Sequence, residues 1–324
     1  MNKILITGFS GFVATHFIEF LFRENLEYEI YGIDINEPQF DYSQFRDKLK
    51  ITYEQVDMTD IRRIRGVVFK FKPDYILHLA AFSSVAYSWK HPSLSFMNNC
   101  NIFLNLINVI REENIKCRIL SVGSSEEYGN VAHEDLPIRE NQNKNPLSPY
   151  AVARLSQEML SKIFVDAYGM DIVMTRSFNH IGPRQDERFV VPSFINRILD
   201  IKRAGKYEGE IETGDISIIR DFVDVRDVVK AYYLLLTKGI KGEVYNICSG
   251  KGITLKEVVD MIANEVGVKI STITAPDYIR PSDNKEIVGS AYKLESELGW
   301  KREYSFSRTI KDMVNYMKDS TTST

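Results

Sequence analysis

The sequence has few cysteines, and their spacing supports neither a metal centre nor a disulfide framework. Only Cys100, Cys117 and Cys248 occur among 324 residues, and no two of them form a Cys-x-x-Cys pair. Zinc sites and small disulfide-bonded domains need closely spaced cysteines in larger numbers. We therefore expect no metal site, and we expect a reducing compartment, the cytoplasm, as the location of the protein.

An excess of charge of one sign is also lacking. The 41 Lys and Arg residues and the 44 Asp and Glu residues leave a formal net charge of −3. Without a basic patch or tail, neither nucleic acid nor a membrane surface is an expected partner. No apolar run is long enough to cross a bilayer, and residues 1–7 enter an apolar pattern without the charged region and cleavage site of a signal peptide.

Short apolar segments alternate regularly with amphipathic segments in the first half of the chain. Apolar strands separated by amphipathic helices indicate a parallel sheet with helices on both faces. The predicted strands are Lys3–Thr7, Glu29–Ile33, Ile51–Gln55, Tyr75–Leu79, Arg118–Val122 and Asp171–Ser177, and the predicted helices are Val13–Glu24, Ile61–Lys70, Met97–Glu113 and Tyr150–Tyr168. The expected fold class is α/β, a doubly wound parallel sheet of the Rossmann type with a smaller interleaved α/β lobe.

Glycines become frequent beyond residue 178, where the pattern of strands and helices is less regular. Such residues mark turns and loops. We expect a first domain over residues 1–178, to which residues 220–248 return, and a second lobe built from residues 179–219 and 249–324.

A glycine-rich turn separates the first predicted strand from the first predicted helix. Gly8 permits a tight turn, Gly11 lets the backbone approach a pyrophosphate, and Ala14 allows the helix to pack closely on the strand. Because the motif directly follows a strand and opens a helix, its position favours a dinucleotide site over an ordinary turn. Phe12 and Val13, at the start of the helix, belong to the same predicted site.

Asp34 ends the second predicted strand. A carboxylate at this position can bind the ribose hydroxyls of adenosine and would repel a 2′-phosphate, so we expect NAD, with NADP less favoured. Further predicted contacts to the cofactor follow the third and fourth strands and are Asp57, Met58, Leu79, Ala80 and Ala81.

Tyr150 and Arg154 lie four residues apart in a predicted helix and therefore share one face. A neighbouring cation lowers the pKa of a phenol, which can then exchange a proton with a sugar hydroxyl or carbonyl. Alone, such a pair is more often an ordinary feature of a helix surface. The glycine turn and the upstream Ser124 make the chemical interpretation the better one.

In this order, the glycine turn, Ser124 and Tyr150 resemble the signature of the extended short-chain dehydrogenase/reductases. The family has lysine where this chain has Arg154, which keeps the positive charge but is bulkier and forms hydrogen bonds differently. Over nearly its whole length the chain is most similar to GDP-mannose 4,6-dehydratases and GDP-4-keto-6-deoxymannose reductases. The matching segments are residues 123–129 (GSSEEYG), 148–153 (SPYAVA), 178–184 (FNHIGPR), 220–227 (RDFVDVRD) and 280–281 (RP).

The resemblance implies an NAD-dependent GDP-sugar 4,6-dehydratase, a lyase. In such enzymes hydride leaves C4 of the sugar for NAD, water is eliminated across C5–C6, and the hydride returns to C6. The resemblance places Tyr150 as the base at the C4 hydroxyl and Glu126 as the acid/base at C5, for which a carboxylate is suited. The implied catalytic residues are Ser124, Ser125, Glu126, Tyr150 and Arg154, of which the last two also contact the cofactor.

The second lobe is expected to bind the nucleotide sugar. A diphosphate needs cations and amide donors. By resemblance, the candidates are Asn179, Arg184, Arg220 and Arg280 for the diphosphate, with Asn99 as a further one, Val190 beside the base and Ser83 beside the sugar.

Three other functions stay open from the residues alone. A 4-keto-6-deoxy nucleotide-sugar reductase would use NAD(P)H and carries the same Ser-Ser-Glu-Glu, a 4-epimerase needs no acid/base at C5, and a non-catalytic nucleotide-binding subunit would tolerate Arg154. Asp34 favours the dehydratase, which regenerates its NAD in each cycle. Because GDP-mannose dehydratases usually bind NADP, Asp34 also leaves room for GDP-N-acetylglucosamine as the substrate.

The resemblance also implies the assembly. Similar enzymes pair through the helices predicted at Met97–Glu113 and Tyr150–Tyr168, so a homodimer or homotetramer is expected.

Overall fold

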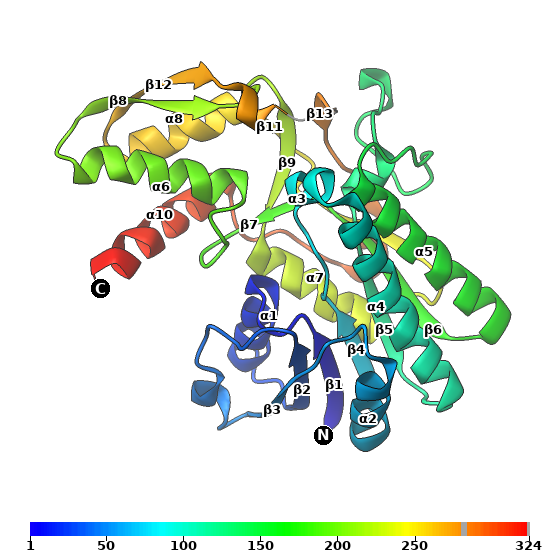
Figure 1. Ribbon diagram of the computed structural model, residues 1–324. Helices are drawn as coiled ribbons and strands as arrows, with labels where there is room; N and C mark the ends of the chain where they lie inside the picture. The colour runs from blue at the N-terminus through cyan, green and yellow to red at the C-terminus, as the bar shows by residue number, and fades with distance from the viewer. Residues whose placement is uncertain (280–283, 323–324) are drawn as a thin grey trace.

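Seven parallel strands form the main sheet of the computed structural model, which describes residues 1–279 and 284–322 (Figure 1). The strands lie in the order β10-β6-β5-β4-β1-β2-β3. In such sheets ligands bind at the carboxyl ends of the strands where the order reverses, here at β1 and β4. The bounds are β1 Asn2–Thr7, β2 Tyr28–Asp34, β3 Leu49–Gln55, β4 Tyr75–His78, β5 Arg118–Ser124, β6 Asp171–Ser177 and β10 Val244–Ile247.

Alternate residues of each strand face two separate apolar cores, because successive side chains of a strand point to opposite faces. Ile4 and Ile6 of β1 pack into the core shared with α1 and α7, whereas Leu5 packs into the core shared with α2, α4 and α5. The helices beside the sheet are α1 Phe12–Arg23, α2 Ile61–Phe71, α3 Val85–Lys90, α4 Pro92–Glu112, α5 Pro149–Tyr168, α7 Val225–Lys238 and α9 Tyr292–Leu298.

Most of the remaining elements form a lobe with its own apolar core, and α6, β8, α8, β12 and α10 lie at the left of Figure 1. Strand β9 pairs with β7, β11 and β13, and β8 pairs with β12. The bounds are β7 Asn179–Ile181, α6 Val190–Arg203, β8 Glu208–Thr213, β9 Ile219–Asp224, β11 Gly252–Thr254, α8 Leu255–Val266, β12 Lys269–Thr274, β13 Glu286–Ile287 and α10 Phe306–Thr322, with 3-10 turns η1 Tyr42–Phe45, η2 Ser125–Tyr128, η3 His133–Asp135 and η4 Pro276–Tyr278.

The predicted fold class is confirmed, and most predicted boundaries fall within two residues of those observed. Helix α4 begins at Pro92, upstream of the predicted Met97. Proline is well suited to the first helical position, because the helix makes no hydrogen bond with the N–H of that residue. The short helix α3 was not predicted.

One part of the predicted domain division differs from the sheet topology. Residues 220–224 belong to β9, which pairs within the lobe, so the return of the chain to the main sheet begins at α7 and continues in β10. The assignment of the two parts to cofactor and substrate stays a prediction.

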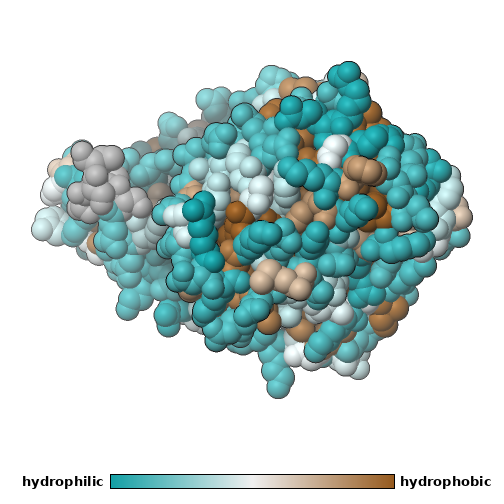
Figure 2. All heavy atoms as spheres, turned by 90° about the horizontal axis from the view of Figure 1, so that it is seen from below, coloured by the Kyte–Doolittle hydropathy of each residue, from teal (hydrophilic) through white to brown (hydrophobic). Residues whose placement is uncertain are grey.

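The face seen in Figure 2 is mostly hydrophilic and carries separate apolar areas. Within the described part of the chain, every helix is too short or too polar to traverse a bilayer.

A buried arginine joins β6, α5 and the turn after β5. Arg176 donates from Nε and Nη2 to Glu158, at 2.8 Å each, and from Nη1 to Tyr128 Oη at 2.7 Å. Although burial raises it, the hydrogen bonds from Arg176 lower the pKa of Glu158 to about 2. The neighbouring Glu127 is also completely buried, and burial followed by the charge of Glu158 raises its pKa well above the ordinary value.

We expect Arg176→Met to lower the free energy of unfolding by about 3–5 kcal/mol, because it leaves the carboxylate of Glu158 buried without its main partner. Arg118 on the neighbouring strand offers a matched control, since its bond to Asp171 is partly exposed. Arg118→Met should cost about 0–1 kcal/mol. Urea unfolding measures both, and equal losses would contradict this account of the buried cluster.

Candidate active site

The backbone of the glycine turn lies so close to the end of β4 that a side chain at Gly8 would clash with it. Gly8 has a φ of +73°, and a Cβ at this position would lie 2.7 Å from the backbone nitrogen of Ala80. Gly11 is the N-cap of α1, and no side chain caps the helix there. The first amides of α1 are therefore available to an anion, as the pyrophosphate of a dinucleotide requires. This observation fits the predicted cofactor.

Asp34 stands at the carboxyl end of β2 beside the glycine turn. Its carboxylate accepts the backbone N–H of Ser10 at 3.1 Å and that of Asn36 at 2.9 Å. These bonds fix its orientation and leave lone pairs for ribose hydroxyls. Asp57 instead accepts the N–H and hydroxyl of Thr59 in the turn before α2, and the adjacent Met58 is buried.

His78 closes β4 inside the protein. Its Nδ1 lies 2.9 Å from the hydroxyl of Thr7, and the residue is completely buried. Burial, with a smaller contribution from the charge of Arg154, lowers the pKa of His78 to about 3. The imidazole is therefore neutral and packs as a core residue. Leu79, Ala80 and Ala81 follow it and are partly exposed.

Tyr150 and Arg154 form a direct pair at the start of α5. Arg154 donates from Nε to the hydroxyl oxygen of Tyr150 at 3.2 Å, and both residues are buried, at 7% and 4% exposure. Ser148 caps the helix by accepting the N–H of Ala151, and Pro149 occupies the first helical position. The capped helix therefore begins at the residue before Tyr150 and presents it in a fixed place.

A second row of polar residues lies beneath this pair. Arg154 donates from Nη1 to the carbonyl of Val122 at 3.0 Å and to Oε1 of Gln157 at 2.9 Å. Gln157 in turn donates to the hydroxyl of Ser121 at 2.9 Å. Sequence reasoning missed Gln157, although its spacing of seven residues from Tyr150 places it on the same helix face.

The turn after β5 carries the predicted acid/base. Ser124 accepts the N–H of Glu126 through its hydroxyl at 3.2 Å, and Glu127 accepts the N–H of Ser124 at 2.8 Å. These reciprocal bonds form a capping box that shapes the turn. Ser125 is buried, Glu126 is half-buried, and the turn packs against α5.

The predicted substrate residues are distributed over the lobe and the loop after β4. Asn179 lies in β7 and is half-buried, Val190 begins α6, and Ser83 is exposed just before the Ser84 cap of α3. Arg220 is buried in β9, where it donates to the carbonyls of Ile219 and Asn284. Arg280 lies outside the described residues. The roles of these residues stay predictions.

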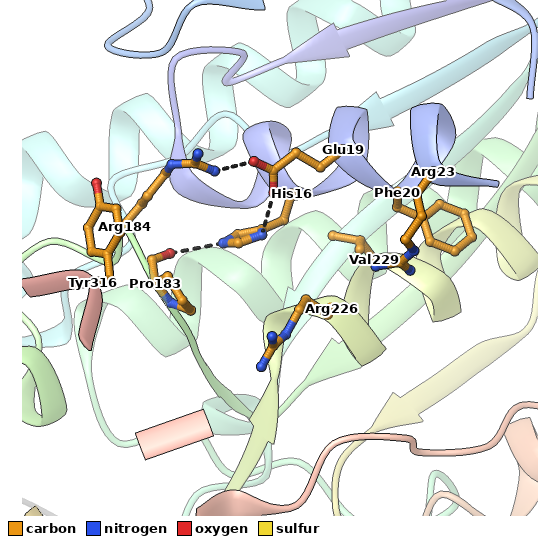
Figure 3. Close-up of a pocket in the computed structure, with 9 residues that line it drawn as sticks. All are labelled: His16, Glu19, Phe20, Arg23, Pro183, Arg184, Arg226, Val229 and Tyr316. Atoms are coloured by element: carbon orange, nitrogen blue, oxygen red, sulfur yellow. Dashed lines mark hydrogen bonds and ion pairs between the residues drawn. The ribbon is translucent and has the colours of Figure 1, made fainter. Parts of the chain in front are cut away.

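Arg184 points to α1 in the structure. It pairs with Glu19 in a surface hollow that also contains His16 and Arg226 (Figure 3). His16 lies 3.1 Å from Glu19 and 2.9 Å from the carbonyl of Pro183. Although burial raises it, the bonds from His16 and Arg184 lower the pKa of Glu19 to about 2. This ion-pair cluster fastens the turn after β7 to α1, a local role that the sequence motif did not indicate.

Asn99 is a structural clamp. Its side-chain amide accepts the N–H of Phe82 at 2.8 Å and donates to the carbonyl of the same residue at 3.2 Å. Both ends of the amide thus serve the loop after β4, a role that the sequence did not indicate, and the expected contact of Asn99 with a diphosphate stays a prediction. Across residues 1–279 and 284–322, no three His, Cys, Asp or Glu side chains gather as ligands for a metal ion.

Comparison with known proteins identifies the family of this site. The family model described as GDP-mannose 4,6 dehydratase matches residues 5–313. GDP-6-deoxy-D-mannose reductase of Pseudomonas aeruginosa is 29% identical, over 97% of this chain and 96% of the relative.

Two solved structures share the fold. One is a protein named RMD from Pseudomonas aeruginosa, complexed with NADPH, with a TM-score of 0.83 and 27% identity over 99% of this chain and 98% of that one. The other is UDP-glucose 4-epimerase of Thermus thermophilus in complex with NAD, with a TM-score of 0.84 and 26% identity over 98% of this chain and 99% of that one. The match of the family model to almost the whole chain shows that this protein belongs to the GDP-mannose 4,6 dehydratase family, among the extended short-chain dehydrogenase/reductases.

Proposed function

We propose that this protein is an NAD-dependent GDP-sugar 4,6-dehydratase, which converts a GDP-hexose into a 4-keto-6-deoxy sugar and water. The observation that carries the proposal is the position of Glu126, in a turn packed against the helix that presents Tyr150. A carboxylate beside a proton-accepting phenol suits an elimination that follows oxidation of a neighbouring carbon.

The glycine turn, the open amides of α1 and the carboxylate of Asp34 would hold the dinucleotide. When bound, it supplies the hydride chemistry, taking a hydride from C4 of the sugar and giving one back at C6. The structural relatives bind NADPH or NAD, and Asp34 favours NAD for this chain because its charge opposes a 2′-phosphate.

Tyr150 removes the proton of the C4 hydroxyl, and Arg154 is hydrogen-bonded to the Tyr150 oxygen from its Nε. Ser124 can donate to the C4 oxygen, because its hydroxyl acts only as an acceptor toward Glu126 N–H. The new ketone makes the proton at C5 acidic.

Glu126 then takes the C5 proton and delivers it to the hydroxyl that leaves C6 as water. Ser125, in the same turn, would assist at C6. C5 then regains a proton from solvent through Glu126, and Tyr150 releases to solvent the proton that it removed from the C4 hydroxyl, so both residues end the cycle as they began it. Arg220 and Asn179 are the proposed contacts of the diphosphate, with Ser83 beside the sugar and Val190 beside the base.

A reductase of a 4-keto-6-deoxy GDP-sugar is the second candidate. The similarity to the Pseudomonas aeruginosa reductase over nearly the full length of both chains favours it. A reductase consumes an added reduced nicotinamide, whereas a dehydratase needs none. Incubation with GDP-mannose and with GDP-N-acetylglucosamine, described below, also tests which hexose is the substrate.

Pairing of two copies through α4 and α5 also belongs to the proposal. Several apolar side chains on these two helices are largely exposed, which supports burial against a second copy. They are Met97 at 58%, Val152 at 40%, Met159 at 57% and Ile163 at 53%.

We expect Glu126→Gln to lower kcat for water elimination from a GDP-hexose by about 10²–10⁴-fold, because the amide cannot carry the C5 proton. Purified protein without added cofactor is incubated with GDP-mannose and with GDP-N-acetylglucosamine, and the 4-keto-6-deoxy product is followed by mass spectrometry. Glu134→Gln, at an exposed glutamate nearby, serves as the control and should keep the parental rate. Undiminished elimination in Glu126→Gln would remove Glu126 from the mechanism.

We expect the parent to bind NAD more tightly than NADP and Asp34→Asn to narrow this preference by about tenfold, or about 1.4 kcal/mol. The neutral amide no longer repels the 2′-phosphate. Isothermal titration with both dinucleotides gives the ratio, and Asp41→Asn, at an exposed carboxylate of the same segment, is the control. A parent that prefers NADP would contradict the role of Asp34.

A further inference from the structure

We propose that Gln157 is the positioning residue that orients Arg154 toward Tyr150, and that it allows an arginine to act where similar enzymes carry lysine. The inference rests on the proposed role of Tyr150 as the group that exchanges a proton with the substrate. Gln157 itself is 1% exposed and lies on the far side of the Arg154 guanidinium from Tyr150, bonded to Nη1 while the phenol is bonded to Nε.

The orientation of the Gln157 amide follows from its partners. The carbonyl of Val122 can only accept, so the group 3.2 Å from it must be the NH2 of Gln157. The guanidinium of Arg154 can only donate, so the group 2.9 Å from its Nη1 must be Oε1 of Gln157. Val122 O thus receives bonds from both side chains, and the three groups lock one another in place.

This arrangement fixes the plane of the guanidinium. Nη1 is held at two acceptors, Val122 O and Gln157 Oε1, and the planar fork then directs Nε–H to the oxygen of Tyr150. Because the guanidinium has no acceptor, the hydroxyl of Tyr150 receives this bond, and its own proton is left to point elsewhere. A hydrogen bond from a charged donor strengthens as negative charge develops on its acceptor, so Arg154 in this orientation can stabilise the Tyr150 oxygen during proton transfer.

Four titratable groups that interact with the charge of Arg154 are neutral at neutral pH. Burial, followed by the charge of Arg154, lowers the pKa of His78 on β4, and burial also lowers that of His180 on β7. Burial raises the pKa of Cys100 on α4 and that of Tyr232 on α7. The turn packed against α5 also carries the carboxyl group of Glu126. The fixed positive charge beside Tyr150 therefore comes from Arg154, and its direction depends on Gln157.

A lysine would not need this support. Its ammonium is a compact charge with three donors that rotate freely, whereas a guanidinium favours the phenolate only when its fork points the right way. Removing the Gln157 amide should therefore lower activity when position 154 is arginine, and should lower it less in an Arg154→Lys background. That coupling separates a positioning role from a merely structural one.

The first test measures the ionisation of Tyr150 in the absence of substrate. Near-ultraviolet titration of the protein, minus that of Tyr150→Phe, isolates the ionisation of this phenol. In Gln157→Leu we expect it to ionise at higher pH than in the parent. Ser161→Ala is the matched control, since Ser161 lies on the same buried face of α5, bonded to Ser121, and does not contact Arg154. It should leave the titration unchanged.

The second test uses turnover. Gln157→Leu should lower kcat about tenfold or more with little change in KM, because Gln157 does not touch the substrate, and the acidic limb of the pH–rate profile should move to higher pH. In the Arg154→Lys background the same substitution should cost less than threefold. Circular dichroism during thermal unfolding checks that each variant is folded. Gln157→Asn, whose shorter amide cannot span the same contacts, replaces Gln157→Leu if the latter does not fold.

The proposal is overturned if a folded Gln157 variant titrates like the parent, if Ser161→Ala produces the same shift, or if the effects of Gln157 and Arg154 simply add. A shifted titration in a protein that eliminates water from no GDP-hexose would support the positioning role and reject the dehydratase. An active dehydratase with an unshifted titration would support the proposed dehydratase and reject the positioning role of Gln157.

Discussion

The buried positive charge of Arg154 is the constraint that organises the centre of this molecule. A guanidinium removed from water must have its donors satisfied, and here a carbonyl of β5, an amide of α5 and the phenol of Tyr150 do so. These bonds tie the carboxyl end of β5 to the helix that follows. Because the Ser124–Glu126 turn continues directly from β5, the same bonds set the place of the proposed acid/base relative to the phenol.

The parallel sheet brings the other proposed contacts to the same edge. Gly8, Asp34 and Ser124 stand at or just beyond the carboxyl ends of β1, β2 and β5, which all run in one direction. Below the turn, Glu127 accepts the N–H of Ser124 and Arg176 donates to the hydroxyl of Tyr128, so that buried hydrogen bonds hold the turn from the inside. The site therefore has two layers. An outer row, which includes Gly8, Asp34 and Ser124, would contact cofactor and sugar, and an inner row of Gln157, Glu127 and Arg176 holds the outer row in place.

Local patterns were enough to propose the outer row, because glycine turns, strand ends and a Tyr-x-x-x-Arg spacing are visible in a short stretch of sequence; the roles of these residues stay predictions. The inner row escaped prediction for a physical reason. Besides its bond to Arg154, Gln157 binds β5 residues 35 and 36 positions away, and Arg176 binds partners 18 or more positions away. An amide or arginine on a helix or strand carries no periodic signal of its own. The bonds of Asn99 to the loop after β4 also escaped prediction, because an amide suited to a phosphate is equally suited to a loop backbone, and only the three-dimensional contacts reveal the second use.

The most direct test of the account follows one deuterium atom through the reaction. GDP-hexose labelled with deuterium at C4 is incubated with the protein in unlabelled water and without added nicotinamide, and the product is analysed by NMR. If oxidation, loss of water and reduction occur in one closed pocket around Tyr150 and Glu126, the label appears in the methyl group at C6. A product whose methyl group lacks deuterium, or turnover that requires an external reductant, would contradict the account.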